Sequence, residues 1–232
     1  MTGPPWCPAA AQSQCVVGTE VRLDMTYIPQ HFRVVDEHTL QEFMRTYDFA
    51  TLVSSSPEGL VASHVPVLVR PSGATLVIVG HMARANHHWQ LMDGATPALA
   101  IFHGPHGYVS PTWYATAPAV PTWNYGVVHA HGLQTVNEDQ AFRRGVVEEL
   151  VRRYEADRPN GWRPESLPTD FYERMLRAIV AFEMPATRLD GKFKLGQNRS
   201  VEDRRRTIAG LEKEGSKEAA WLAEFMRRRA GA

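Results

Sequence analysis

One stretch decides the fold: residues 49–81 read FATLVSSSPEGLVASHVPVLVRPSGATLVIVGH. Three apolar runs, at 49–54, 60–69 and 75–81, are separated by short segments that are rich in Ser, Pro and Gly. Apolar and β-branched runs bounded by such residues are typical of β-strands, and the short gaps between them indicate hairpins. Because hairpin turns join antiparallel neighbours, we expect these strands to form an antiparallel sheet.

The segments on either side extend this pattern, with strands first and helices later. Further strands at 98–102 and 123–136 bring the number of short strands to five or more, which is typical of a barrel or sandwich. The other predicted elements are helices at 36–47 with Asp36 as N-cap, at 86–93, at 138–155 with Asn137 as N-cap and from 170, a strand at 180–189, and a helical tail at 200–229 that begins at Ser200. The sequence therefore predicts an α+β fold built on an antiparallel barrel or sandwich.

Composition excludes several classes of protein. The 232 residues carry 25 Lys and Arg against 25 Asp and Glu, so the formal net charge is zero and nucleic acid is not an expected partner. The only cysteines are Cys7 and Cys15, which excludes zinc-thiolate sites and cysteine nucleophiles from the body of the chain and suits the cytoplasm. No apolar run approaches the ~20 residues that cross a bilayer, so no membrane is expected. Residues 1–24 lack a signal-peptide pattern and are expected to be a disordered extension, or to precede a true start at Met25.

His64 is the first residue that could carry chemistry. It lies inside a predicted strand, where alternation places it on one face with Leu60, Ala62, Pro66 and Leu68. An imidazole among apolar neighbours is either a structural hydrogen-bonding group or an axial ligand to a haem iron. The residues alone favour the structural role.

Three further groups are candidates for binding. His129 and His131 share one face of a strand, a spacing that suits a metal, but no third ligand at a defined spacing accompanies them. The aromatic segments 108–114 and 121–125 either wall a flat ligand or form a small aromatic core under a loop. Segment 192–199, KFKLGQNR, concentrates cations and amides that bind phosphate or carboxylate, unless it is a solvated turn.

Four other histidines are expected at surface or turn positions. His87 and His88 fit an exposed pair on a helix, and His103 and His106 flank Gly-Pro in a predicted turn. The sequence contains no GxSxG, GxGxxG, HExxH or Walker motif, so neither a hydrolase nor a nucleotide-triphosphate enzyme is indicated.

A set of short segments resembles, in the same order, the motifs of the PaiB-like family of FMN-binding negative transcriptional regulators. The resemblance covers residues 25–211. The segments are MTYIP at 25–29 followed by His31 and Phe32, ATLV at 50–53, SHVP at 63–66, GHMARAN at 80–86, AIFHGP at 100–105, YVSP at 108–111, PTWNY at 121–125 and KLGQNR at 194–199.

The resemblance implies a dimeric split β-barrel of the FMN-binding type at 25–211, with flanking helices and a helical tail at 212–232. It also implies a flat cofactor near the subunit interface. The family includes FMN-binding regulators and haem-dependent piperazate synthases. The latter close N5-hydroxy-L-ornithine to the cyclic hydrazine L-piperazate, joining its two nitrogens with loss of water.

Two departures from the regulators favour haem b over FMN. Segment 115–120 is short and uncharged where regulators have a longer one that contains Lys, and Gly196 replaces the usual Ser. Both losses weaken a phosphate site. A haem needs an apolar slot, an axial ligand and cations for its propionates, and His64 is then the implied iron ligand. The other implied cofactor contacts are Arg84, Trp123, Asn124, Lys194 and Arg199, with Thr122 and Tyr125 at the reacting substrate.

Two alternatives stay open beside this homodimeric haem enzyme that acts on a small amino acid. An FMN-binding regulator or oxidoreductase would bind phosphate near Arg84, Lys194 or Arg199, and its regulatory form would bind DNA in a salt-dependent manner. A partner-binding barrel with a vacant cleft would not be stabilised by any cofactor.

Overall fold

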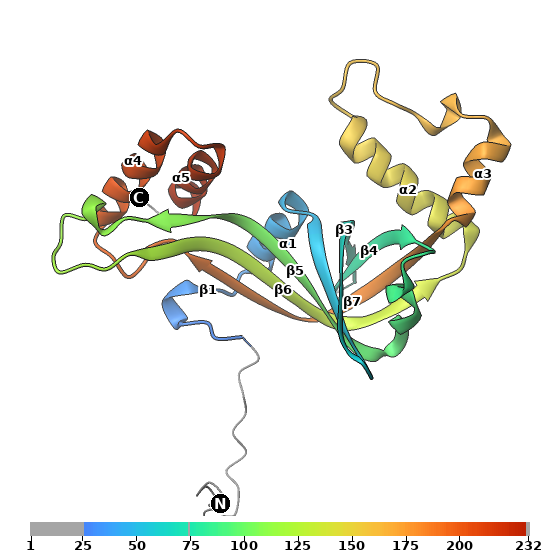
Figure 1. The fold of residues 1–232 in the computed structure, drawn as a ribbon, viewed down its shortest axis with the longest axis horizontal. Helices are drawn as coiled ribbons and strands as arrows, with labels where there is room; N and C mark the ends of the chain where they lie inside the picture. The colour runs from blue at the N-terminus through green and yellow to red at the C-terminus, as the bar shows by residue number, and fades with distance from the viewer. Residues whose placement is uncertain (1–25, 74, 231–232) are drawn as a thin grey trace, which may run out of the picture.

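The computed structural model describes residues 26–73 and 75–230, so residues 1–24, Met25 and both cysteines lie outside the described residues. Figure 1 shows the elements in chain order. The strands are β1 (Arg33–Val34), β2 (Phe49–Ser56), β3 (Gly59–Ser72), β4 (Thr75–Ala83), β5 (Asp93–Val109), β6 (Thr122–Asn137) and β7 (Ile179–Lys194). The helices are α1 (Glu37–Thr46), α2 (Gln140–Glu155), α3 (Thr169–Arg177), α4 (Val201–Glu214) and α5 (Lys217–Ala230), with short 3-10 turns η1 (Gln30–Phe32), η2 (His87–Leu91), η3 (Pro111–Trp113) and η4 (Pro164–Ser166).

The strands β2 to β7 pair in a closed antiparallel ring. Their order is β7-β4-β3-β2-β5-β6, and β6 pairs again with β7, while β1 adds to β7. The two hairpins predicted at 49–81 are confirmed, with Thr51 opposite His64 and Val69 opposite Ile78. Mixed helices and antiparallel strands therefore agree with the predicted α+β class.

Alternation along the strands fills the ring with apolar side chains. Leu52, Ile78, Phe102 and Phe182, from four different strands, are fully buried. Burial of each such side chain contributes roughly 1.5–3 kcal/mol. Helix α1 adds Phe43 and its neighbours to the same core.

The strands β5, β6 and β7 extend beyond the ring as an arm, over which α4 and α5 pack (Figure 1). The ring of Phe225 in α5 lies 5.8 Å from that of Phe43 and 5.1 Å from that of Phe193. A Cβ at Gly126 would come within 2.7 Å of Phe225, so the absent side chain lets α5 approach β6. Since α5 shares the core of the sheet, the structure shows no separation at the predicted tail boundary of 211.

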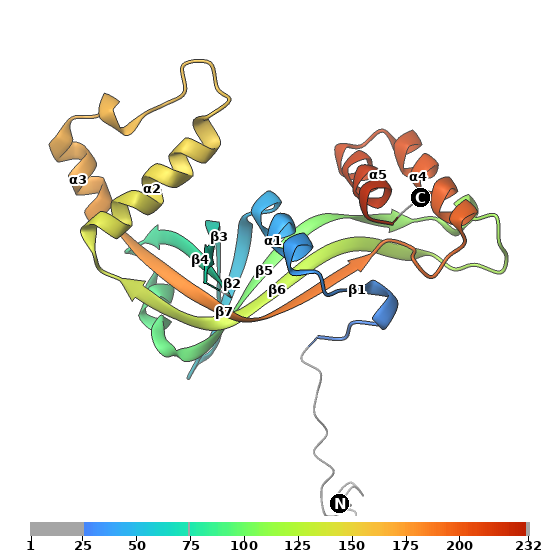
Figure 2. The same cartoon turned by 180° about the vertical axis from the view of Figure 1, so that it is seen from behind.

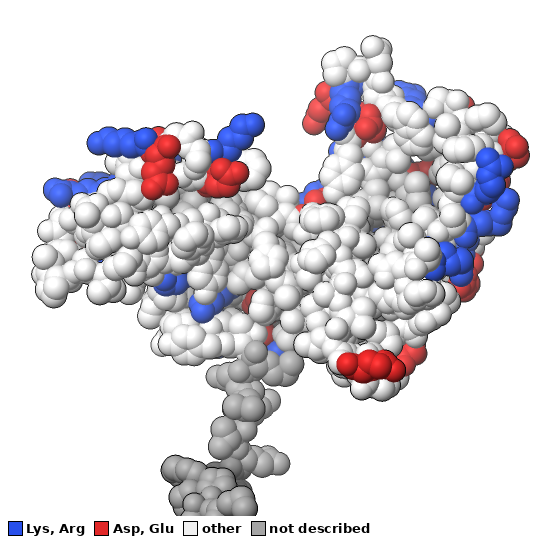
Figure 3. All heavy atoms as spheres, in the orientation of Figure 1, with Lys and Arg blue, Asp and Glu red and all other residues white. Residues whose placement is uncertain are grey.

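The helices α2 and α3 form a lobe at the opposite end of the molecule from α4 and α5 (Figure 2). Val146 and Leu150 of α2 form a small apolar cluster with Leu68 and Val79 of the sheet. On the face drawn in Figure 3, charged side chains of both signs gather on the two helical lobes. Within the described part of the chain, no helix has the length and apolarity to cross a membrane.

Helix starts were mostly readable from the sequence. The carboxylate of Asp36 accepts the N–H of Thr39, and the hydroxyl of Ser200 accepts the N–H of Asp203, which confirms both predicted caps. Helix α2, in contrast, is capped by Asp139 rather than Asn137. The predicted single tail helix is two helices, because Gly215 ends α4 with a φ of 72°.

Two predictions for the histidines were wrong. The short helix expected at 86–93 is present as the 3-10 helix η2 with Asn86 as its N-cap, but His88 is 2% exposed rather than on the surface. His103 and His106 lie in β5, not in a turn, because residues 103–109 pair with β6 across a register shift.

Candidate functional site

The outer surface of β3, β2, β5, β6 and β7 exposes an unusual number of large apolar side chains. We call it the outward face, and its exposed apolar members include Leu60 at 79%, Phe49 at 63%, Trp123 at 48% and Tyr108 at 46%. Such exposure over adjoining strands marks a binding surface.

A lateral row of paired residues crosses this face. His64 is opposite Thr51, Thr51 is opposite Ile101, Ile101 is opposite His129, and His129 is opposite Asp190. Directly paired residues point to the same side of a sheet, so both histidines and Asp190 belong to the outward face. With neighbouring strands about 4.8 Å apart, His64 and His129 are separated by about 14 Å along the sheet.

A hollow of about 370 Å³ opens in the outward face between β5 and β7. The imidazole of His106 stacks on Trp123, with ring centroids 5.9 Å apart and planes at 27°. One wall of the hollow is therefore aromatic and can stack on a flat ligand. The lining residues are Thr26, His103, Gly104, His106, Trp123, Tyr125, Gly126, Val127, His129 and Lys192.

Two lysines of β7 border this hollow. The ammonium of Lys192 donates to the carbonyl oxygen of Tyr27 at 2.9 Å and lies 5.5 Å from the ring centroid of Tyr125. The ammonium of Lys194 donates to the hydroxyl of Thr122 and, at 2.7 Å, to the carbonyl of Trp123. Burial and then the nearby Lys192 lower the pKa of Lys194. The two lysines thus place positive charge beside the hollow, which suits a carboxylate or phosphate group of a ligand.

Histidines on this face are biased toward the neutral form. Burial, and after it the charges of His106 and His64, lower the pKa of His103. Burial and then His131 lower the pKa of His129. Neutral imidazoles can accept a proton or a metal bond.

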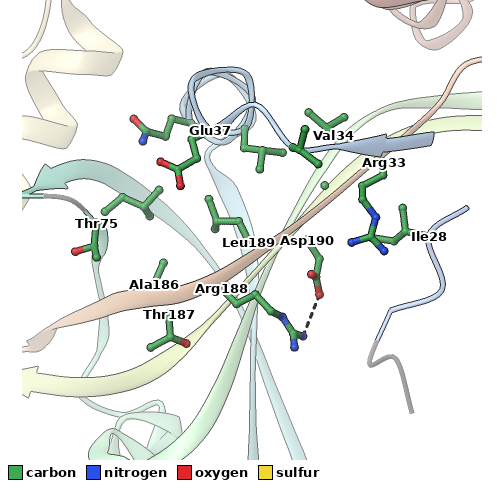
Figure 4. A pocket seen from close by; sticks show the side chains of 15 residues that line it. Ile28, Arg33, Val34, Glu37, Thr75, Ala186, Thr187, Arg188, Leu189 and Asp190 are labelled. Atoms are coloured by element: carbon green, nitrogen blue, oxygen red, sulfur yellow. Dashed lines mark hydrogen bonds and ion pairs between the residues drawn. The ribbon is translucent and has the colours of Figure 1, made fainter. Parts of the chain in front are cut away.

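Asp190 connects the outward face to a second hollow. Its carboxylate lies 3.0 Å from the guanidinium of Arg188 and 3.1 Å from Nε2 of His131. Figure 4 shows this hollow, whose volume is about 320 Å³, with Asp190 and Arg188 on β7, Glu37 on α1 and Arg33 on β1.

The structure brings only some of the predicted site residues together. Trp123 and Tyr125 line the hollow, Thr122 and Lys194 contact each other at its border, and His64 lies on the same outward face. The structure thus places these residues on one face, and their roles stay predictions.

Three other predicted contacts lie elsewhere. Asn124 is 3% exposed and its amide donates to the sulfur of Met226, because alternation turns it toward α5. The guanidinium of Arg84 donates to two carbonyls near α3, 3.3 and 3.4 Å away. Arg199 lies over the ring of Tyr114, 4.5 Å from its centroid. None of the three lines the hollow among the described residues.

Sequence reasoning missed several residues of the hollow. Lys192 was noted only as part of a basic segment, and Thr26 only as part of a family motif. His103 and His106 were assigned to a turn. Alternation along β7 places Lys192 on the same face as Lys194. No pattern in the sequence around Thr26 indicates its contact with His129.

Comparison with known proteins identifies the family of this chain. A family model described as "Putative FMN-binding domain" matches residues 26–188. The "Protease synthase and sporulation protein PAI 2" of Bacillus subtilis (strain 168) is 31% identical over 203 residues, which cover 86% of this chain and 96% of that protein.

Two solved structures share the fold at low identity. The FAD and haem binding protein from Mycobacterium smegmatis matches with a TM-score of 0.55 and 17% identity, over 71% of this chain and 74% of that one. A flavocytochrome from Azotobacter vinelandii matches with a TM-score of 0.58 and 13% identity, over 78% and 79%. At these identities the likeness is one of fold.

Proposed function

Because the chain belongs to the FMN-binding domain family whose model matches residues 26–188, we propose that its outward face holds a flat cofactor and that the ring is a split barrel of this family's type. The cofactor is haem b held through His64. The reaction is closure of N5-hydroxy-L-ornithine to L-piperazate with loss of water. The place of action is the cytoplasm.

The setting of His64 is the observation that carries the haem assignment. Its imidazole is exposed, stacks at 6.5 Å on the ring of Phe49, and forms no hydrogen bond with any described residue. A structural histidine would use its ring nitrogens, as His88 does with two serines. A free imidazole on an apolar face fits an axial haem ligand. The FAD and haem binding protein from Mycobacterium smegmatis, which shares the fold, supports the same use of this fold.

The two lysines of β7 fit the propionates of the haem. Haem propionates need cations beside an apolar surface. Lys192 lines the hollow and Lys194 contacts the carbonyl of Trp123 beside it, whereas neither Arg84 nor Arg199 lines the hollow. We therefore assign the propionates to the two lysines rather than to Arg84 or Arg199.

The residues beside the hollow would position the substrate. Lys194 can only donate, so the Thr122 oxygen accepts its proton and the Thr122 hydroxyl hydrogen stays available for the substrate. Tyr125 adds a phenol on the same wall. Bound haem supplies an iron centre that polarises the N–O bond of the hydroxylamine. The α-amine then attacks the side-chain nitrogen of the same molecule. Because a short carbon chain joins the two nitrogens, no encounter between two molecules is needed.

A second copy of the chain would complete the site. Phe49 stacks on His64, Leu60 lies four residues from it along β3, and both apolar side chains are largely exposed, so a haem on this face would meet water without a cover. An apolar surface of this kind suits a homodimer. A dimer across the outward face would enclose the cofactor between subunits.

FMN is the second candidate, favoured by the description of the matching family. Its phosphate would use the same lysines of β7. The Gly196 departure carries less weight against it than expected, because Gly196 has a φ of 83°, where Ser would be strained. Backbone conformation alone thus explains this glycine.

An absorption spectrum tests the proposal. We expect protein produced with added haem precursor to show a Soret band that is lost in His64→Ala and kept in the control His87→Ala, an exposed histidine of η2. The haem-loaded protein should convert N5-hydroxy-L-ornithine to piperazate. A flavin spectrum without a Soret band would establish the FMN alternative instead.

A further inference from the structure

A hydrogen-bonded chain leads from the hollow to a charged group behind it. Nδ1 of His129 lies 3.3 Å from Oγ1 of Thr26, and the same oxygen lies 3.3 Å from Oδ2 of Asp190. His129 lines the hollow, and Asp190 lies opposite it on β7. Side chains from the N-terminal segment, β6 and β7 therefore form one connected unit.

The direction of these bonds fixes the tautomer of His129. The hydroxyl of Thr26 donates its single proton to Oδ2 of Asp190. The oxygen of Thr26 then accepts, which requires a proton on Nδ1 of His129. In the neutral ring Nε2 carries the lone pair, and Nε2 has no hydrogen-bond partner among the described residues. A nitrogen base is thus held by a third group, as in other acid–base pairs.

Asp190 is itself fixed in place. The guanidinium of Arg188 donates to it at 3.0 Å and also lies 2.8 Å from Nε2 of His131. Arg188 thus donates to both Asp190 and His131, and Nε2 of His131 lies 3.1 Å from the same carboxylate oxygen. The hydroxyl of Thr26 therefore links Asp190 to His129 by hydrogen bonds.

The charged and titratable groups around His129 come from three strands. They are His131 on β6, Asp190 and Lys192 on β7, and His103 on β5. Burial, the first of the causes, lowers the pKa of His129, and Asp190 opposes this only in part. The imidazole is therefore neutral near pH 7, the form that can take a proton.

We propose, on the basis of the function above, that Nε2 of His129 is the base that takes a proton from the α-ammonium group of the substrate. Thr26 and Asp190 are its positioning residues. The α-ammonium loses two protons as the N–N bond forms. One goes to His129 and then to solvent, and the other leaves with the departing hydroxyl as water. The bond that breaks is N–O, so no external oxidant or reductant enters.

The first test reads the tautomer without turnover. In protein labelled with ¹⁵N-histidine, the signals of His129 are identified by their loss in His129→Gln. We expect the Nδ1–H tautomer in the wild type, a mixture in Thr26→Val, and recovery in Thr26→Ser. A wild-type His129 with its proton on Nε2 would overturn the proposal, whatever reaction the protein catalyses.

The second test reads catalysis. With an equal Soret band, His129→Gln should lower kcat by about 10²-fold or more and lose the acid limb of the pH–rate profile. The control His87→Gln should keep both. A His129→Gln enzyme as fast as an active wild type would overturn the role of His129 and leave the proposed function intact. A haem-loaded wild type that makes no piperazate would overturn both.

Discussion

Nε2 of His88 lies 3.0 Å from Oγ of Ser54 inside the ring, where both residues are 2% exposed. Ser54 donates its proton to the amide oxygen of Gln134, so its oxygen accepts from the imidazole. On the other side, Ser63 lies 2.9 Å from Nδ1 and accepts the amide of Asn86. Each hydrogen bond of this series has one donor and one acceptor only when the imidazole of His88 is neutral.

The interior network makes stability depend on pH. Burial lowers the pKa of His88 below its ordinary value. Below about pH 6.5 the unfolded chain binds a proton that the folded chain refuses, so the free energy of unfolding rises with pH through this window. We expect the urea midpoint to fall as pH is lowered from about 7 to about 5.

The variant His88→Gln should make that pH dependence shallower, because one buried imidazole is removed. It should also cost about 1–3 kcal/mol at pH 7, since the serines lose a matched partner. The exposed His87→Gln is the control and should leave both quantities unchanged. Identical pH profiles for wild type and His88→Gln would contradict the role assigned to His88.

Packing of α5 on the sheet gives a second prediction. A Cβ at Gly126 would meet Phe225 at 2.7 Å and Phe43 at 3.0 Å, so Gly126→Ala should destabilise the fold by about 1–3 kcal/mol. Gly145 lies within α2 with nothing within 4 Å of its would-be Cβ. Gly145→Ala should therefore stabilise by about 0.5–1 kcal/mol. Thermal unfolding of the two variants would show opposite shifts, and equal shifts would refute this account of Gly126.

The sequence predicted the ring better than the arm. The alternation at 49–81 and its tight turns are local signals, and they gave the correct pairing of β2, β3 and β4. Strand β5 was expected only at 98–102, because Gly104 and Pro105 resemble a turn. Pairing of His106 with Tyr125, beyond a register shift, holds that segment extended. Only the partner strand, far along the chain, supplies this information.

The site divides in the same way. Alternation was enough to place His64, Trp123 and Tyr125 on accessible positions. It also implies that Asn124 faces away from Trp123, which the family motif obscured. The charge of Arg84 and Arg199 suggests a cofactor contact, but their partners lie at residues 177–179 and at Tyr114 and could not be predicted from neighbouring residues.

The charge of Lys192 should contribute to cofactor binding. Its ammonium borders the hollow and can form a charge-assisted bond with a propionate or a phosphate. We expect Lys192→Gln to raise the Kd of the cofactor about tenfold, or about 1.4 kcal/mol. Titration of the apoprotein, followed by absorbance, measures this. Lys213→Gln, on α4, is a matched loss of charge, and an equal loss of affinity there would show a general charge effect instead.

The outward face gives the last prediction, which concerns assembly. Leu60 is 79% exposed on the outward face, four residues along β3 from His64, and would be buried between two copies of the chain. Leu60→Glu places a charge in that interface and should shift sedimentation from dimer to monomer, with a weaker Soret band because the haem loses its cover. Val201→Glu is the control, because Val201 is a 47% exposed residue in the first turn of α4, where an acidic side chain is favourable. A wild type that sediments as a monomer with haem bound would contradict the shared site, since His64 and its apolar neighbours would then bind the cofactor without a second copy.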